Sequence, residues 1–112
     1  MSVVHPINLE RLMFLCDDDR TEAHELLELT LENAEGLIAQ MTSALDRSEL
    51  TEIKRAAHQL RGSAGNVGAD EVATLAEHIE RSIEGDAAAI GAHIDDIRNA
   101  LERLRAAASE LT

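Results

Sequence analysis

The chain has 112 residues, of which 22 are acidic and 10 are basic, and its formal net charge at pH 7 is −12. This length is enough for one domain with its own core and too short for two, so we expect residues 1–112 to form a single domain. A strongly negative protein repels nucleic acid and anionic lipid, so neither is an expected partner. Phe14 is the only aromatic residue and Pro6 the only proline, a composition that suits packed helices better than a β-sandwich.

The single cysteine and the absence of apolar runs bear on the compartment. Cys16 has no partner for an intramolecular disulfide, which suits a reducing cytoplasm. The first residues contain no run that fits a signal peptide, and no later run is long enough for a membrane span. We therefore expect a soluble cytoplasmic protein, and the initiating Met with the compact length favours a free-standing one.

Apolar residues return at helical spacing from the N-terminus onward. A short helix is expected over residues 8–16. The acidic run at 17–19 should end it and supply capping carboxylates for the next helix. The second helix is expected over residues 21–45, with an apolar stripe wide enough, including Leu29, to contact more than one neighbour.

Three further helices are expected in the second half of the chain. Ser48 is the expected N-cap of the third, which should run over residues 49–67. The fourth should begin at Asp70, with Gly85 at its C′ position, and Asp86 should cap the last helix. The apolar face of the fourth helix comprises Val72, Leu75, Ala76, Ile79 and Ile83. The most regular stripe belongs to the last helix and comprises Ile90, Ile94, Ile97, Leu101, Leu104, Ala108 and Leu111.

These elements predict an all-α fold. Four long amphipathic helices joined by short breaks favour an antiparallel up-down-up-down four-helix bundle, because short loops leave no room for crossover connections. The short N-terminal helix would cap one end of the bundle. No internal repeat or linker interrupts the pattern.

Two glycines in the third helix need an explanation. Gly62 and Gly65 belong to a segment that resembles a turn. The buried stripe nevertheless continues through them at the spacing of a helix. That stripe comprises Ile53, Ala57, Leu60, Ala64 and Val67. Each glycine in a helix interior costs about 1 kcal/mol relative to alanine, so these two glycines point to a function rather than to stability.

The glycines share one face of this helix with a histidine and three cations. The residues at offsets −4, −3, +3, +4 and +7 from His58 lie on its face. They are Lys54, Arg55, Arg61, Gly62 and Gly65. Helical side chains lean toward the N-terminus, so glycine at position 62 leaves the imidazole uncovered, and Gly65 clears the next turn. A neutral imidazole is nucleophilic, and the three cations could neutralise the roughly two negative charges of a phosphoryl group. We therefore expect His58 to accept a phosphoryl group.

The stretch from residue 58 to residue 68 reads H-Q-L-R-G-S-A-G-N-V-G. It resembles the signature of histidine-containing phosphotransfer (HPt) domains, H-x-L-[KR]-G-S-x-x-x-[LVF]-G. The resemblance implies a four-helix bundle with a helical cap, and a role in a multistep phosphorelay. His58 would accept a phosphoryl group from a receiver-domain aspartate and pass it to another receiver, with Arg61 assisting the phosphate and Gly62 giving access. The resemblance also implies that Glu80 orients the other ring nitrogen.

The implied partners are the receiver domains of response regulators and of a hybrid sensor histidine kinase. No cofactor or metal is expected on this chain, because the magnesium should lie on the receiver. The chain would be a phosphotransfer intermediate with no kinase activity of its own, since 112 residues leave no room for an ATP-binding domain. We expect it to be a monomer.

Two other classes of function stay open. The chain could be a non-catalytic helical adaptor that docks receiver domains without being phosphorylated, or a structural oligomerising bundle. A carboxylate-bridged metal bundle is disfavoured, because none of the five histidines has Glu three positions before it. Cys16 is expected in the core. The remaining histidines, His5, His24, His78 and His93, are expected to be solvated surface residues.

Overall fold

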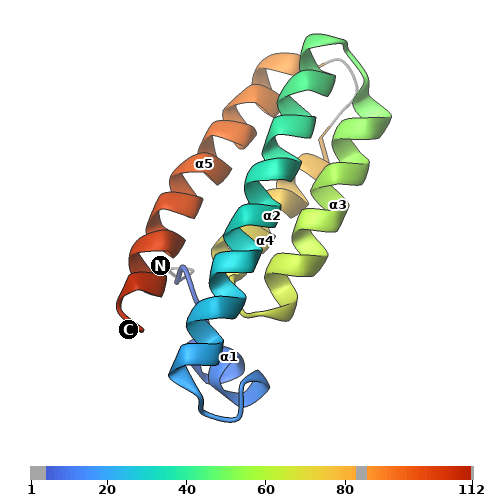
Figure 1. Cartoon of the computed structure of the whole chain (residues 1–112). Coiled ribbons are helices and arrows are strands. Elements are labelled where there is room, and N and C mark those ends of the chain that lie inside the picture. The colour runs from blue at the N-terminus through green and yellow to red at the C-terminus, as the bar shows by residue number, and fades with distance from the viewer. Residues whose placement is uncertain (1–4, 83–85, 112) are drawn as a thin grey trace.

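The computed structural model describes residues 5–82 and 86–111. In this part of the chain there are five α-helices and no strand (Figure 1). They are α1 (Leu9–Leu15), α2 (Arg20–Asp46), α3 (Leu50–Asn66), α4 (Asp70–Glu80) and α5 (Ala87–Ser109). The prediction of an all-α fold is confirmed. None of the helices in the described ranges is both long enough and apolar enough to cross a lipid bilayer.

The four longer helices form a closed bundle in which each helix packs against two of the others. α2 packs against α3 and α5, and α4 packs against the same two helices from the other side. Figure 1 shows α2, α3 and α5 side by side along the length of the molecule, with α1 below the start of α2. Each longer helix turns an aliphatic stripe inward, and the stripe expected on the last helix is buried from Ile90 to Leu111. Cys16 is also buried, as predicted.

Three side chains cap helix N-termini as their residue types favour. The Asn8 side chain accepts a hydrogen bond from the backbone N–H of Arg11 at the start of α1. Asp19 accepts two backbone hydrogen bonds at the start of α2, and Asp86 accepts one at the start of α5. The predicted caps at the acidic run and at Asp86 are confirmed, because short carboxylates satisfy N–H groups that have no partner within the helix.

Ser48 does not cap α3, and that prediction is wrong. Its φ is 55°, in the left-handed region, and its N–H donates to Leu45 O while the N–H of Glu49 donates to Ala44 O. This pair of bonds closes the end of α2 with Ser48 at the C′ position. Glu49 occupies the N-cap position of α3 and makes no side-chain capping bond. The serine is therefore used to end one helix rather than to begin the next.

α3 ends in the same way at a glycine. Gly68 has φ +83°, its N–H donates to Gly65 O, and the N–H of Ala69 donates to Ala64 O. α3 therefore continues through Gly62 and Gly65 to Asn66, as its apolar stripe predicts. The described part of α4 ends at Glu80. Ile83 and Gly85, expected on the apolar face of the fourth helix and just after its end, lie outside the described residues.

Two of the histidines expected at the surface are partly buried instead. The ring of His24 on α2 bonds through Nδ1 to the carbonyl oxygen of Ala108 at 3.0 Å. This carbonyl, in the last turn of α5, also accepts from the N–H of Leu111. Arg20 makes similar bonds to the carbonyls of Glu110 and Leu111. His93 on α5 has a buried Nδ1 with no hydrogen-bond partner. Its ring lies 5.8 Å from that of His78, between centroids.

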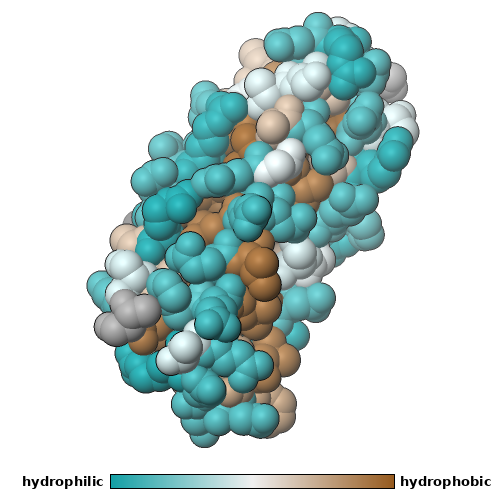
Figure 2. All heavy atoms as spheres, in the orientation of Figure 1, coloured by the Kyte–Doolittle hydropathy of each residue, from teal (hydrophilic) through white to brown (hydrophobic). Residues whose placement is uncertain are grey.

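Exposed apolar side chains gather at the α1 end of the molecule. Four large apolar side chains are exposed in the described part of the chain: Leu9, Phe14, Leu15 and Leu29. Figure 2 shows an apolar strip over the lower half of this face, among mostly polar residues. Leu29 is thus on the surface of α2 and does not widen its buried stripe. α1 is joined to the end of α3 by a hydrogen bond from Arg11 Nε to Asn66 O.

Candidate functional site

The site begins with an uncovered histidine on α3. The side chain of His58 is 66% exposed. A Cβ built on Gly62 would meet no atom within 4 Å, and one built on Gly65 would meet only the Cβ of Ala73, at 3.9 Å. Neither glycine is required by backbone strain or by crowding, so packing does not explain their presence. They leave space beside the imidazole, as the sequence predicts.

The ring of His58 is held from α4, the helix that packs against α3. Nδ1 lies 3.1 Å from Oε2 of Glu80, whose side chain is mostly buried. A carboxylate only accepts hydrogen bonds, so this contact requires a proton on Nδ1. In the neutral ring Nε2 then carries the lone pair. Among the described residues no hydrogen bond reaches Nε2, so this lone pair is unoccupied there.

Arg61 completes a three-residue cluster. Its Nε donates to Oε1 of Glu80, and its NH2 group lies 3.2 Å from Nδ1 of His58. Because Nδ1 already carries a proton for Glu80, this approach is a contact rather than a second hydrogen bond. One carboxylate therefore fixes both the tautomer of the histidine and the position of the guanidinium.

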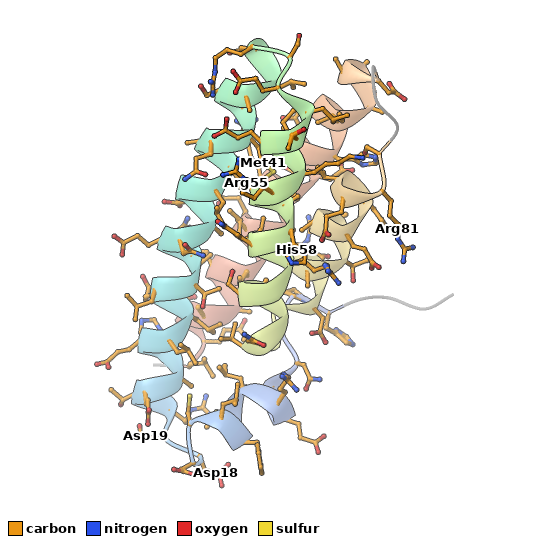
Figure 3. The ribbon with its side chains drawn as sticks, turned by 90° about the vertical axis from the view of Figure 1, so that its right-hand side faces the viewer. Asp18, Asp19, Met41, Arg55, His58 and Arg81 are labelled. Carbon is orange, nitrogen blue, oxygen red and sulfur yellow. The ribbon has the colours of Figure 1, made fainter. Side chains whose placement is uncertain are left out.

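His58 and Arg61 border an open hollow of about 420 Å³ between α3 and α4. The hollow is lined by His58, Arg61, Gly62, Gly65, Asn66, Ala73, Thr74 and Glu77. Figure 3 shows His58 leaving α3 toward α4, with Arg81 at the far end of α4. Both glycines lie along its wall.

Of the three cations expected beside His58, Arg61 lines the same hollow as the histidine. Arg61 is the one Lys or Arg side chain, within the described ranges, that lines the hollow beside His58. Arg55 instead lines a separate hollow at the start of α3, together with Ser48 and Glu52. Lys54 lines neither hollow. Lys54 and Arg55 share a helical face with His58, one turn before it, and their part in neutralising a phosphoryl group stays a prediction.

Glu77 lines the hollow although the sequence did not single it out. It precedes Glu80 by three positions on α4, so the two carboxylates lie on one helical face. That spacing was a usable signal once Glu80 had been placed beside His58. Glu77 forms an ion pair with Arg81 at 2.7 Å, and Arg81 is 77% exposed.

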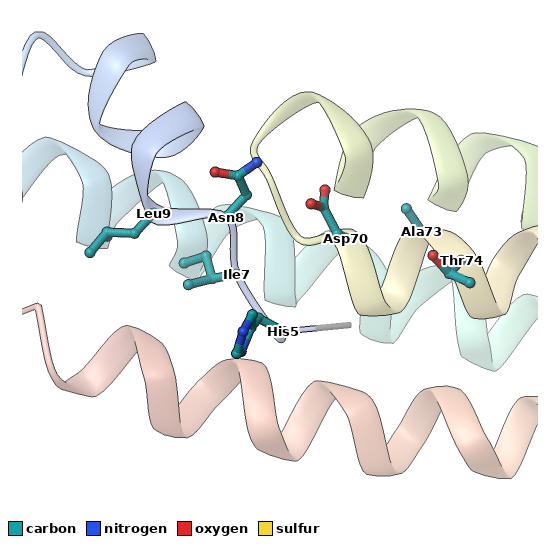
Figure 4. Close-up of a pocket in the computed structure, with 7 residues that line it drawn as sticks. All are labelled: His5, Ile7, Asn8, Leu9, Asp70, Ala73 and Thr74. Atoms are coloured by element: carbon teal, nitrogen blue, oxygen red, sulfur yellow. The ribbon is translucent and has the colours of Figure 1, made fainter. Parts of the chain in front are cut away.

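A second open hollow lies at the start of α4, beside the N-terminal segment (Figure 4). Its lining residues are His5, Ile7, Asn8, Leu9, Asp70, Ala73 and Thr74. Ala73 and Thr74 line both hollows, so the two are neighbours. In the described ranges no group of three or more His, Cys, Asp or Glu side chains is placed to hold a metal ion.

Comparison with known families decides the assignment. The sequence model of the Hpt domain matches residues 25–107, which include the whole of α3 and α4. The chain belongs to the Hpt domain family. The resemblance stated from residues 58–68 is thus confirmed. No curated protein sequence matches the chain.

The fold of this Hpt domain is shared with a solved structure. Histidine-containing phosphotransfer protein B (HptB) from Pseudomonas aeruginosa PAO1 superposes with a TM-score of 0.80 and 19% sequence identity. The match covers 94% of this chain and 92% of that protein. At this identity the likeness establishes a common fold, and the roles of individual residues depend on the geometry described above.

Proposed function

We propose that this Hpt protein is a phosphorelay intermediate in which Nε2 of His58 carries the phosphoryl group. The observation that carries the proposal is the contact of Nδ1 with Glu80. It leaves Nε2 unprotonated on an exposed ring whose neighbour, Gly62, has no side chain. The Hpt family match supports phosphotransfer as the general role.

The chemistry follows from the tautomer. The lone pair of Nε2 attacks the phosphorus of an aspartyl phosphate on a receiver domain, so an N–P bond forms and the acyl O–P bond breaks. The aspartate leaves as a carboxylate with the bonding electrons. The ring keeps its Nδ1 proton and becomes positively charged, and the carboxylate of Glu80 stabilises that charge. Transfer to a second receiver is the reverse reaction.

The neighbours of His58 have distinct roles in this proposal. Arg61 is placed to contact phosphoryl oxygens, because its NH2 group lies beside the ring while Glu80 holds its Nε. Gly62 and Gly65 give the receiver loop access to Nε2. Magnesium and most of the transition-state stabilisation are expected on the receiver, so the isolated chain should have little activity.

The receiver would dock over His58 and the α1 end of the bundle. The exposed side chains of Leu9, Phe14, Leu15 and Leu29 offer the apolar contact that such an interface needs. The expected donor is the receiver of a hybrid sensor histidine kinase, and the expected acceptor is a response regulator.

We also propose that residues 1–112 act as one cytoplasmic monomer, with the long helices in antiparallel up-down-up-down order. The contact of each long helix with two others and the short connections between them support the up-down-up-down order. Cys16, which is buried and forms no disulfide, suits a reducing compartment.

The test is transfer from a receiver domain that has been phosphorylated with labelled acetyl phosphate and then freed of the donor. We expect acid-labile, base-stable label on the wild-type chain and none on His58→Gln. His78→Gln is the matched control, since His78 is an exposed histidine on α4, and it should label normally. Undiminished labelling of His58→Gln would overturn the assignment. Receiver binding without any label on the wild type would favour the adaptor.

A further inference from the structure

The charges around His58 determine how firmly a phosphoryl group is held there. Arg61 beside the ring is paired with Glu80. Glu77 on the wall of the hollow is paired with Arg81. In these two ion pairs two cations and two carboxylates cancel, so the pairs bring no net charge to the hollow.

We infer that Glu77 and Glu80 keep this site neutral so that the phosphoryl group is passed on rather than stored. The inference rests on the function proposed above and concerns its equilibrium. A phosphoryl group brings about two negative charges to His58. With no excess of cations to meet them, the phosphorylated state of His58 is raised in free energy relative to a cation-rich site. The equilibrium is therefore shifted toward phosphoaspartate on the receiver.

The exchange is balanced without any other reactant. In one direction the N–P bond of phosphohistidine breaks and the acyl O–P bond of phosphoaspartate forms, and Nδ1 keeps its proton in both states. Charges near His58 therefore act directly on the ratio of the two phosphorylated proteins. Glu77 is the residue whose effect can be isolated. It lines the hollow, and among the described residues its ion pair is with Arg81. Glu80, in contrast, also fixes the tautomer of His58.

The experiment measures that ratio at equilibrium in a mixture of the chain, a receiver domain and Mg²⁺. Equilibrium is approached from the phosphorylated receiver and, separately, from phosphorylated His58, so that changes in rate are not mistaken for changes in the ratio. Glu77→Gln removes one negative charge from the hollow and should raise the share on His58 by about threefold to tenfold. Arg81→Gln leaves Glu77 unneutralised and should lower that share.

Glu52→Gln is the matched control. The Glu52 side chain is 39% exposed against 37% for Glu77, and it too is within ion-pair distance of an arginine, Arg47. Its substitution changes the net charge equally, but it borders the hollow at the start of α3. We expect the ratio to stay at the wild-type value. In 1 M salt the effect of Glu77→Gln should shrink, since the Debye length falls to about 3 Å.

Two results would overturn the inference while leaving the proposed function intact. One is an unchanged equilibrium ratio in Glu77→Gln with normal labelling of His58. The other is an equal rise in Glu52→Gln, which would assign the effect to overall charge. Absence of label on His58 in every variant would instead overturn the proposed function, and the inference with it.

Discussion

Asn8 and Gly68 join the N-terminal segment to the turn between α3 and α4. The backbone N–H of Asn8 donates to the carbonyl oxygen of Gly68 at 2.6 Å. A Cβ on Gly68 would lie 2.8 Å from the carbonyl oxygen of Asn8, and the φ of Gly68 is +83°. Both backbones thus approach as closely as a glycine allows.

Gly68→Ala should therefore destabilise the fold. The left-handed conformation alone costs about 1–2 kcal/mol for a residue with a Cβ, and the contact with Asn8 adds to it. We expect the free energy of unfolding in urea, followed by far-UV circular dichroism, to fall by about 2 kcal/mol or more. Gly36→Ala is the control, because nothing lies within 4 Å of its Cβ position in α2. A loss below about 0.5 kcal/mol in Gly68→Ala would contradict the strained close approach.

Substitutions at Gly62 should affect the stability of the fold and the rate of phosphotransfer in different ways. Its Cβ position is empty, as in Gly36, so Gly62→Ala and Gly36→Ala should each stabilise the protein by about 1 kcal/mol. Gly62→Gln should abolish transfer from a phosphorylated receiver because its side chain leans over the ring of His58. Gly36→Gln should transfer normally. Normal transfer by Gly62→Gln would refute the role of access.

Glu80→Gln should slow transfer at saturating receiver by about tenfold, the low end of the loss seen when the carboxylate that orients a metal-binding histidine is removed. An amide can still accept the Nδ1 proton, but it stabilises the charged phosphohistidine less than a carboxylate. Long-range ¹H–¹⁵N correlation spectra of His58 should show a single Nδ1–H tautomer in the wild type and a mixture in the variant. Glu71 lies on α4, as Glu80 does, and pairs with Arg103 of α5. Glu71→Gln loses this comparable pair and should change neither observable. A wild-type spectrum with the proton on Nε2 would exclude the proposed nucleophile.

Phe14→Ala should weaken receiver docking without weakening the fold. The side chain is 81% exposed, so its removal should leave the unfolding midpoint unchanged. We expect the KM for the phosphorylated receiver to rise about fivefold or more, because exposed aromatic residues are frequent anchors of interfaces. Direct labelling of His58 by phosphoramidate needs no docking and should be unaffected. An unchanged KM would place the interface away from α1.

Cys16 should make stability fall at alkaline pH. Burial raises the pKa of its thiol above the ordinary value, and the carboxylates of Glu22, Asp19 and Asp17 add to the shift. The folded state therefore keeps the thiol proton to higher pH than the unfolded state does. Stability is unaffected below the ordinary thiol pKa of about 8.5 and decreases as the pH rises through the folded-state pKa.

The alkaline fall can be measured cleanly in this chain. It has no tyrosine, and Lys54 is its only lysine, so few other groups titrate in that range. Urea unfolding between pH 8 and 10 should show a smaller decrease in Cys16→Ala than in the wild type. Equal decreases in the two proteins would exclude Cys16 as the cause.

Features that depend on a single helix, namely its apolar face and its N-terminal cap, could be predicted from the sequence. The buried stripe of α3 placed Gly62 and Gly65 inside the helix, because an apolar face must stay in phase to remain in the core. The caps at Asp19 and Asp86 followed from local hydrogen bonding. These predictions needed no knowledge of neighbouring helices.

The predictions that failed depended on other elements. His24 was expected at the surface, but its ring bonds to a carbonyl at the end of α5, a helix that offsets on α2 cannot reveal. Ser48 suits an N-cap by residue type, and only the left-handed backbone shows that it closes α2 instead.

The empty space beside Gly62 has a consequence for the whole pathway. Because position 62 meets nothing, a single substitution there can silence the chain without unfolding it. A Gly62→Gln copy would still occupy receivers through α1 while returning no phosphoryl group. Expressed beside the wild type, it would act as a dominant competitor, and the strength of the output would depend on the ratio of the two copies.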